Sequence, residues 1–186
     1  SDRLAWLRLA QANAQESVRI KMQDRLQLSD RYLSLKEELG LEQIPLRMER
    51  FDISHSHGEA TVASCVVFDQ NGPAKSDYRR FNIKDVTASD DYGAMEQALR
   101  RRYKRIVEGA KKPDLLLIDG GKGQVGVAEK VLAELGVSDV PILGVSKGVT
   151  RKPGMEVLIM DGESFQLESD SPALHLIQYI RDEAHR

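Results

Sequence analysis

Short apolar runs that end in polar or turn residues recur along this chain and predict the strands of a sheet. The clearest run, residues 115–118, is followed by Asp119 and a glycine-rich turn. An unbroken apolar run of this length is typical of a strand buried on both faces. Residues 46–54 form a second candidate strand, in which Asp52 lies between two large apolar residues. A charge within or at the end of a buried strand is costly unless something compensates it, so these two carboxylates are the first candidates for chemistry.

The remaining pattern predicts strands and helices that are joined by clear turns. Residues 59–68 and 75–83 are typical of strands, and the turn between them contains Asn71-Gly72, a strong hairpin signal. Gly40 is a natural end for the first helix. Further strands are predicted at 141–145 and 155–160, and helices at 1–40, 95–110, 124–135 and 173–185. This order favours an α/β fold with a mixed five-stranded sheet, an antiparallel meander followed by parallel strands, and helices on both faces.

A helical crossover separates the first three strands from the strand that ends at Asp119. Such a connection lets the later strand return parallel beside the first, so we expect Asp52 and Asp119 on neighbouring strands. Residues 1–40 form a helical lead-in, for which a packing or linker role is favoured, and residues 41–186 form the α/β domain. The chain opens within a polar helix and stops at Arg186 without a helix stop signal, which indicates a piece of a larger protein.

Composition narrows the classes of function. Charged residues make up 30% of the 186 residues and hydrophobic residues 41%, as in ordinary globular proteins. The net charge of −2 excludes nucleic-acid binding by bulk charge alone, so any such binding needs local patches. The single cysteine, Cys65, excludes an internal disulfide and fits a reducing compartment, so we expect a cytoplasmic protein. No apolar run approaches the roughly 20 residues of a membrane helix.

The two aspartates predict a divalent-metal site. Carboxylates a few ångströms apart repel each other, and both stay ionised only when a cation lies between them. Oxygen ligands suit Mg²⁺ or Mn²⁺, and two such ions about 4 Å apart can activate a water and stabilise the leaving oxygen of an in-line displacement. Asp91, at the start of a helix, and His185, on the last helix, are candidates for the further ligands.

Each candidate also has a purely structural interpretation. Asp91 is equally suited to cap its helix, and a lone histidine near a helix end, such as His185, is usually a surface residue. His55 and His57 resemble a metal cluster, but solvated rings beside a loop are the favoured interpretation. Asp52 can also pair with an arginine, an alternative that its position between two large apolar residues disfavours.

Two basic segments are candidates for phosphate contacts. The turn at 120–123 departs from the phosphate-loop template because glycine follows Lys122, but glycine amides and a lysine at a helix start suit one phosphate. A later loop adds Lys147, Arg151 and Lys152 without a carboxylate. Such a run is usually solvated surface. Beside a site that cuts phosphodiesters, it would hold the nucleic-acid backbone without reading its sequence.

Eight segments of the chain form a recognisable set. They are 50–55 (RFDISH), 60–68 (ATVASCVVF), 78–83 (YRRFNI), 90–92 (DDY), 117–124 (LIDGGKGQ), 144–148 (GVSKG), 171–175 (SPALH) and 180–185 (IRDEAH). Together they closely resemble the C-terminal half of the UvrC family, whose members are components of the bacterial UvrABC excinuclease. The resemblance runs from about residue 40 to the end of the chain. It implies an RNase H-like endonuclease domain that makes the 5′ incision in nucleotide excision repair.

The resemblance also implies roles for single residues and for partners. Family metal ligands correspond to Asp52, Asp119 and His185, and a further functional aspartate corresponds to Asp91. The implied partners are damaged double-stranded DNA and, in the full-length protein, the UvrB–DNA complex. The family's GIY-YIG domain, which makes the 3′ incision, its UvrB-binding motif and its helix-hairpin-helix tail have no counterpart in this sequence.

The favoured function is therefore metal-dependent hydrolysis of a DNA phosphodiester by an activated water. Asp52 would coordinate the metal centrally, and Lys122, Lys147, Arg151 and Lys152 would hold backbone phosphates. Two other classes of protein fit parts of the pattern. In a non-catalytic nucleic-acid module the acidic pair would hold only a structural ion, and replacement of Asp52 would leave cleavage intact. In a nucleotide-binding enzyme built on the glycine-rich turn, binding would depend on Lys122 instead.

Overall fold

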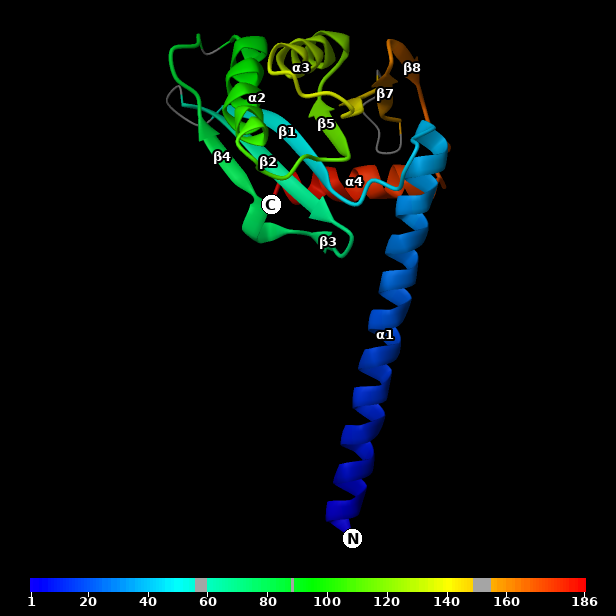
Figure 1. Cartoon of the computed structure of the whole chain (residues 1–186). Helices are drawn as coiled ribbons and strands as arrows, with labels where there is room; N and C mark the ends of the chain where they lie inside the picture. Colours follow the sequence, from blue (N-terminus) through cyan, green and yellow to red (C-terminus); the bar gives the residue numbers. More distant parts are fainter. Residues whose placement is uncertain (56–59, 88, 149–154) are drawn as a thin grey trace.

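One mixed sheet with helices on both faces forms the body of the protein (Figure 1). The computed structural model describes residues 1–55, 60–87, 89–148 and 155–186. Within these ranges the helices are α1 (Asp2–Leu39), α2 (Asp91–Val107), α3 (Lys122–Glu134) and α4 (Pro172–Ala184), with a 3₁₀ turn at Lys75–Asp77. The strands are β1 (Met48–His55), β2 (Thr61–Asp69), β3 (Gly72–Pro73), β4 (Arg79–Asn82), β5 (Leu115–Asp119), β6 (Ile142–Ser146), β7 (Val157–Met160) and β8 (Glu163–Phe165). The strand order is β3-β2-β1-β5-β6-β7-β8, and β4 pairs with β2.

The expected meander and the expected parallel return are both present. β2 pairs antiparallel with β1 and with β4, and β5 lies parallel beside β1. The first residues of the predicted third strand form the 3₁₀ turn, so only its later part, β4, pairs with β2.

The sheet has eight strands within the described ranges, so the expected number of five is too low. The short strand β3 closes the hairpin that the Asn-Gly signal predicts, with Asp69 paired to Gly72. A further hairpin, β7–β8, extends the sheet antiparallel beyond β6. Its turn is Asp161-Gly162, and both residues have positive φ, 52° and 80°. This is the backbone geometry of a two-residue hairpin, which an Asp-Gly pair adopts readily.

Two apolar clusters cover the two faces of the sheet. On one face, Leu115 and Leu117 of β5 pack with α4 and with the end of α1. On the other face, Leu116 and Ile118 pack with the inner sides of α2 and α3. Successive strand residues alternate between the faces, so the identity of the packed residues shows which way each strand position points. The expectation of helices on both faces is confirmed.

The long helix α1 docks on the sheet only through its last turns (Figure 1). Tyr32 and Leu35 are buried, and the Ser34 hydroxyl accepts a hydrogen bond from the backbone N–H of Ala173 in α4 (3.2 Å). Gly40 ends the helix in the left-handed conformation, with φ 65°, as predicted. The earlier turns lie in solvent, and Trp6 is 72% exposed. None of the described helices is both long enough and apolar enough to cross a membrane.

Candidate functional site

The parallel pairing of β1 and β5 places Asp52 and Asp119 side by side. The register pairs Phe51 with Ile118, and the next residue on each strand is the aspartate. Met48 of β1 and Leu117 of β5 both belong to the apolar cluster under α4. By strand alternation, Asp52 and Asp119 point to that same face. The two carboxylates therefore share one face of the sheet at the ends of neighbouring strands, as the sequence predicts.

A buried arginine joins the two carboxylates. Nη1 of Arg50 donates a 2.7 Å hydrogen bond to Oδ2 of Asp52, and its Nη2 lies 3.6 Å from Oδ1 of Asp119. Arg50 and Asp52 are only 2% and 6% exposed. The expectation that Asp52 has no arginine partner was therefore wrong. Positions two apart on a strand share a face, and Arg50 supplies the counter-charge that a buried carboxylate needs.

The surroundings of Asp52 leave its carboxylate short of positive charge. Burial raises the pKa of Asp52 above its usual value, the Arg50 guanidinium opposes the rise, and the nearby charge of Asp119 adds to it. The imidazole of His185 also lowers the pKa of Asp52, which shows that the C-cap of α4 lies within electrostatic range. The fold thus places Asp52 beside Asp119 with His185 within electrostatic range, and burial disfavours the charged form of Asp52.

Asp91, the first residue of α2, pairs with a histidine at the end of β1. Oδ1 of Asp91 is 2.8 Å from Nε2 of His55, whose Nδ1 is 3.1 Å from the hydroxyl of Thr61. His55 follows Phe51 at even spacing on β1, so it points to the α2 side of the sheet, opposite to Asp52. The helix cap is Asp90, whose carboxylate accepts the N–H of Gly93 (2.9 Å). The cap interpretation therefore applies to Asp90 and not to Asp91.

The role of His55 was missed in the sequence, where a solvated ring was favoured. It is the last residue of β1, and its ring bridges that strand to the start of α2. The available signal was its even spacing from Phe51, which places it toward α2. His57, the other histidine of the proposed cluster, lies outside the described residues.

The predicted phosphate-binding residues are only partly described. Lys122 is exposed and begins α3, directly after the turn that follows Asp119, and Lys147 is exposed directly after β6. Arg151 and Lys152 lie outside the described residues. The turn itself needs glycine at position 120, where φ is 149° and an added Cβ would lie 2.6 Å from Gln124. The turn therefore brings the start of α3 close to Asp119.

The carboxylates of Asp52 and Asp119, with the imidazole of His185, are ligands that suit a hard divalent cation. In this structure the two carboxylates instead contact the guanidinium of Arg50. Across the described part of the chain, no group of three or more His, Cys, Asp or Glu side chains is placed to hold a metal ion. A guanidinium nevertheless already bridges Asp52 and Asp119, so the position between them accepts positive charge. Two carboxylates with a nearby imidazole suit Mn²⁺, and carboxylates suit Mg²⁺. A cation at this position would have to replace the contacts of Arg50.

Comparison with known proteins agrees with the resemblance in the sequence. The profile of the UvrC RNase H endonuclease domain matches residues 36–186. The chain is 57% identical to the UvrABC system protein C of Chromohalobacter salexigens and to that of Pseudomonas putida KT2440, in each case over 99% of this chain and 31% of the relative. The chain thus spans about a third of the length of these curated relatives.

Solved structures with a similar arrangement are more distant. A Ciona intestinalis endonuclease V in complex with an inosine-containing DNA matches with a TM-score of 0.42 and 16% identity, over 75% of this chain and 61% of that one. The Bacillus subtilis endonuclease V matches with a TM-score of 0.41 and 15% identity, over 75% of this chain and 78% of that one. The match of the domain profile, together with relatives that are 57% identical, shows that the chain belongs to the UvrC RNase H endonuclease domain family.

Proposed function

We propose that this chain is the part of a UvrC protein that makes the 5′ incision beside damaged DNA in nucleotide excision repair. The observation that carries the proposal is the placement of Asp52 and Asp119 on one face of adjoining strands. Membership in an endonuclease domain family and the name of the relatives, UvrABC system protein C, support the reaction and its setting. The proposed partners are damaged double-stranded DNA and, in the full-length protein, the UvrB–DNA complex. The proposed location is the cytoplasm.

We propose further that Asp52, Asp119 and His185 hold Mg²⁺ or Mn²⁺. When bound, such a cation supplies Lewis-acid activation of water and stabilisation of the leaving oxygen of a phosphodiester. Asp52 is the central ligand in this proposal, because it lies within reach of Arg50 and within electrostatic range of the other two groups.

Other residues of the chain would orient the substrate and support the ligands. Asp91 would assist from the start of α2, where its contact with His55 fixes its position. Lys122 and Lys147, at the ends of the turns after β5 and β6, would hold backbone phosphates together with Arg151 and Lys152.

An incision assay tests this proposal. The full-length protein, with its UvrB partner and a duplex that carries one lesion, should cut 5′ to the lesion with Mg²⁺ or Mn²⁺ and should not cut with EDTA. Cleavage that persists in EDTA would overturn the metal-dependent reaction. If the chain were instead a nucleotide-binding enzyme, a labelled nucleotide would bind it and Lys122→Ala would abolish that binding.

Removing Arg50 should weaken the metal-free fold and strengthen cation binding. Arg50→Met leaves Asp52 buried without its partner, so the free energy of unfolding in EDTA should fall by about 3 kcal/mol. The same carboxylates should bind Mn²⁺ at least about tenfold more tightly, because two unit charges 4 Å apart interact by about 4 kcal/mol in a partly polar site. Urea unfolding and titration with Mn²⁺ followed by electron paramagnetic resonance measure the two effects.

The matched control for this variant is Arg100→Met, which removes surface ion pairs with Glu96 on α2 and Glu134 on α3. It should leave Mn²⁺ binding unchanged and stability within about 1 kcal/mol. Equal or weaker Mn²⁺ binding by Arg50→Met would contradict the view that Arg50 and a cation compete for the same two carboxylates.

A further inference from the structure

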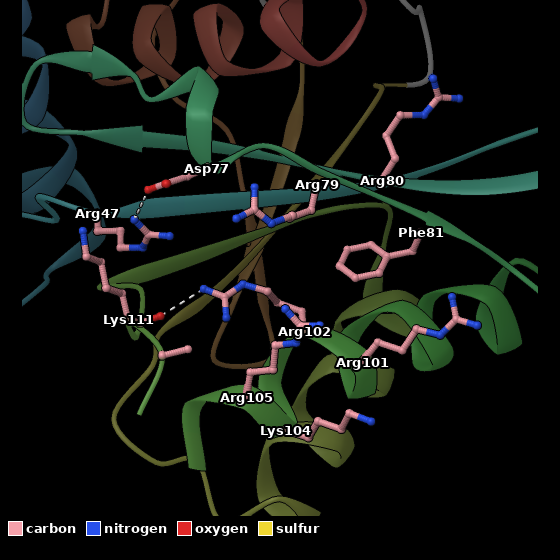
Figure 2. A pocket seen from close by; sticks show the side chains of 11 residues that line it. Arg47, Asp77, Arg79, Arg80, Phe81, Arg101, Arg102, Lys104, Arg105 and Lys111 are labelled. Carbon is pink, nitrogen blue, oxygen red and sulfur yellow. Dashed lines mark hydrogen bonds and ion pairs between the residues drawn. The ribbon is translucent and has the colours of Figure 1, made fainter. Parts of the chain in front are cut away.

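A strongly basic pocket lies between β4 and α2, near the start of β1 (Figure 2). Its cavity is about 590 Å³, and eight of its eleven lining residues are arginine or lysine. Because the whole chain has a net charge of −2, these residues form a pronounced local excess of positive charge. Asp52 lies five residues after Arg47, the lining residue that precedes β1, so about 16 Å of strand separates the two positions. The lining residue Arg79 pairs with Cys65 of the α2-side cluster, so the pocket opens on the face of the sheet opposite to the one that carries Asp52.

Within the described residues, six of the eight lining cations form no ion pair with a carboxylate. Arg47 pairs with Asp77 (2.9 Å), and Arg102 pairs with the buried Glu49 (2.7 Å). In the part of the chain that the structure describes, the hydrogen bonds of the Arg79 and Arg101 side chains all go to backbone carbonyls.

Lys104 and Arg105 are exposed one turn further along the same face of α2 as Arg101. In the described ranges, no ion pair with a carboxylate is formed by Lys104 or Arg105, and none by Arg79 or Arg101. Their positive charge therefore remains available for an external anion.

The basic surface continues from this pocket to the candidate site. A second cavity, of about 610 Å³, is lined by four cationic side chains, one carboxylate and Ser64, among other residues. The cations are Lys75, Arg79, Arg80 and Arg186, and the carboxylate is Glu183, which pairs with Arg186. Across the sheet, Ser64 pairs with Asp52 on one side and with Arg80 on the other. Strands are about 4.8 Å apart, so Arg80 lies about 10 Å from Asp52 along this row.

Edge strand β4 connects the two cavities, because Arg79 and Arg80 line both of them. Neighbouring strand residues point to opposite faces, and Figure 2 shows Arg79 extending over the pocket while Arg80 extends away from it. The arginines of β4 thus carry the positive surface around the edge of the sheet, from the Asp52 face to the α2 face.

We propose that this basic track, defined by Arg79, Arg80, Arg101, Lys104 and Arg105, binds the sugar-phosphate backbone of the DNA that leads away from the incision site. Arginine dominates the track, and its planar fork binds phosphate through two parallel hydrogen bonds. Contacts of this kind position a duplex without reading its sequence. A protein partner fits less well because the core of a protein interface is rich in aromatic and apolar groups, whereas Phe81 and Ala110 are the apolar lining residues of the pocket. That the bound DNA leads away from an incision site rests on the proposed function. That the track binds DNA at all does not rest on it.

The test is equilibrium binding of a fluorescein-labelled 24-base-pair duplex to this chain in EDTA, followed by anisotropy at several salt concentrations. Lys104→Ala/Arg105→Ala should weaken binding at least about tenfold at 50 mM salt. It should also reduce the slope of log K against log salt by about 2, because each lost phosphate contact removes about 0.9. The matched control is Arg3→Ala/Arg8→Ala, which removes two exposed arginines at the far end of α1 and should bind like the wild type.

Three results of the binding measurements would overturn the proposal, and a competition experiment supplies a fourth. They are an unchanged slope and affinity in the α2 variant, an equal loss in the α1 control, and absence of measurable binding by the wild type at 50 mM salt. A polyglutamate that competes as well as DNA at equal charge would assign the track to an acidic protein partner and would also reject the proposal. The binding assay is run in EDTA and requires no incision. Failure of the incision reaction would therefore leave the binding result interpretable, and the two proposals fail separately.

Discussion

Replacing Asp52 with asparagine should lower the rate of 5′ incision by at least about a thousandfold. The amide keeps the shape of the side chain but loses the charge that holds a cation and repels Asp119. A metal ion contributes several kcal/mol of transition-state stabilisation, and about 4 kcal/mol corresponds to a thousandfold in rate. The measurement is single-turnover incision of a duplex with one lesion by the full-length protein together with its proposed UvrB partner.

Two comparisons make this result specific. Glu129→Gln, which neutralises an exposed carboxylate on α3, should incise at the wild-type rate. The resemblance to the family implies that a separate GIY-YIG domain makes a 3′ incision, and this cut should continue in Asp52→Asn and report an intact complex. If Asp52→Asn cut 5′ to the lesion at the normal rate, the acidic pair would have a structural role, and the chain would act as a non-catalytic module.

Replacing Glu49 with alanine should destabilise the protein by about 3 kcal/mol or more. The side chain of Glu49 is fully buried and accepts hydrogen bonds from Arg47 (3.1 Å), Arg102 (2.7 Å) and the Tyr103 hydroxyl (3.0 Å). Its removal leaves two largely buried guanidiniums and a buried hydroxyl without their shared acceptor. Breaking a buried ion pair from one side typically costs about 3–5 kcal/mol.

Thermal and urea unfolding measure this loss, which corresponds to a fall in Tm of roughly 6–12 °C for a chain of this size. The control is Glu96→Ala, whose carboxylate accepts from Arg100 and Lys130 at the surface and is 33% exposed. It should cost less than about 1 kcal/mol. Similar losses in the two variants would show that burial does not set the strength of the Glu49 contacts.

The layout of the site could be predicted because it follows from strand order. A buried apolar run that ends in Asp119, and a helical crossover before it, were enough to place β5 parallel beside β1. Alternation along the strands then fixes the shared face of Asp52 and Asp119. Helix ends were also predictable where one residue decides them, as at Gly40, since glycine adopts the left-handed conformation without strain.

The partners of these residues could not be predicted, because side-chain contacts depend on packing that the local pattern does not record. The contact of Arg50 with both carboxylates needs the strand register, and the contact of His55 with Asp91 joins residues 36 positions apart. The basic track combines β4 and α2, whose cations look like separate solvated surfaces along the sequence. The first turns of α1 have helical spacing of apolar residues, yet Leu4 and Leu7 remain exposed. The spacing of these residues predicts a helix, but it does not predict whether another part of the protein packs against their side chains.

The most direct test of the central claim is a crystal of this protein soaked in Mn²⁺ and measured at the manganese absorption edge. The account predicts an anomalous peak between the carboxylates of Asp52 and Asp119, within reach of His185, and a guanidinium of Arg50 that has moved away from at least one of them. Absence of a peak at this position, with Arg50 still bridging both aspartates at saturating Mn²⁺, would contradict the claim that the two aspartates share a cation.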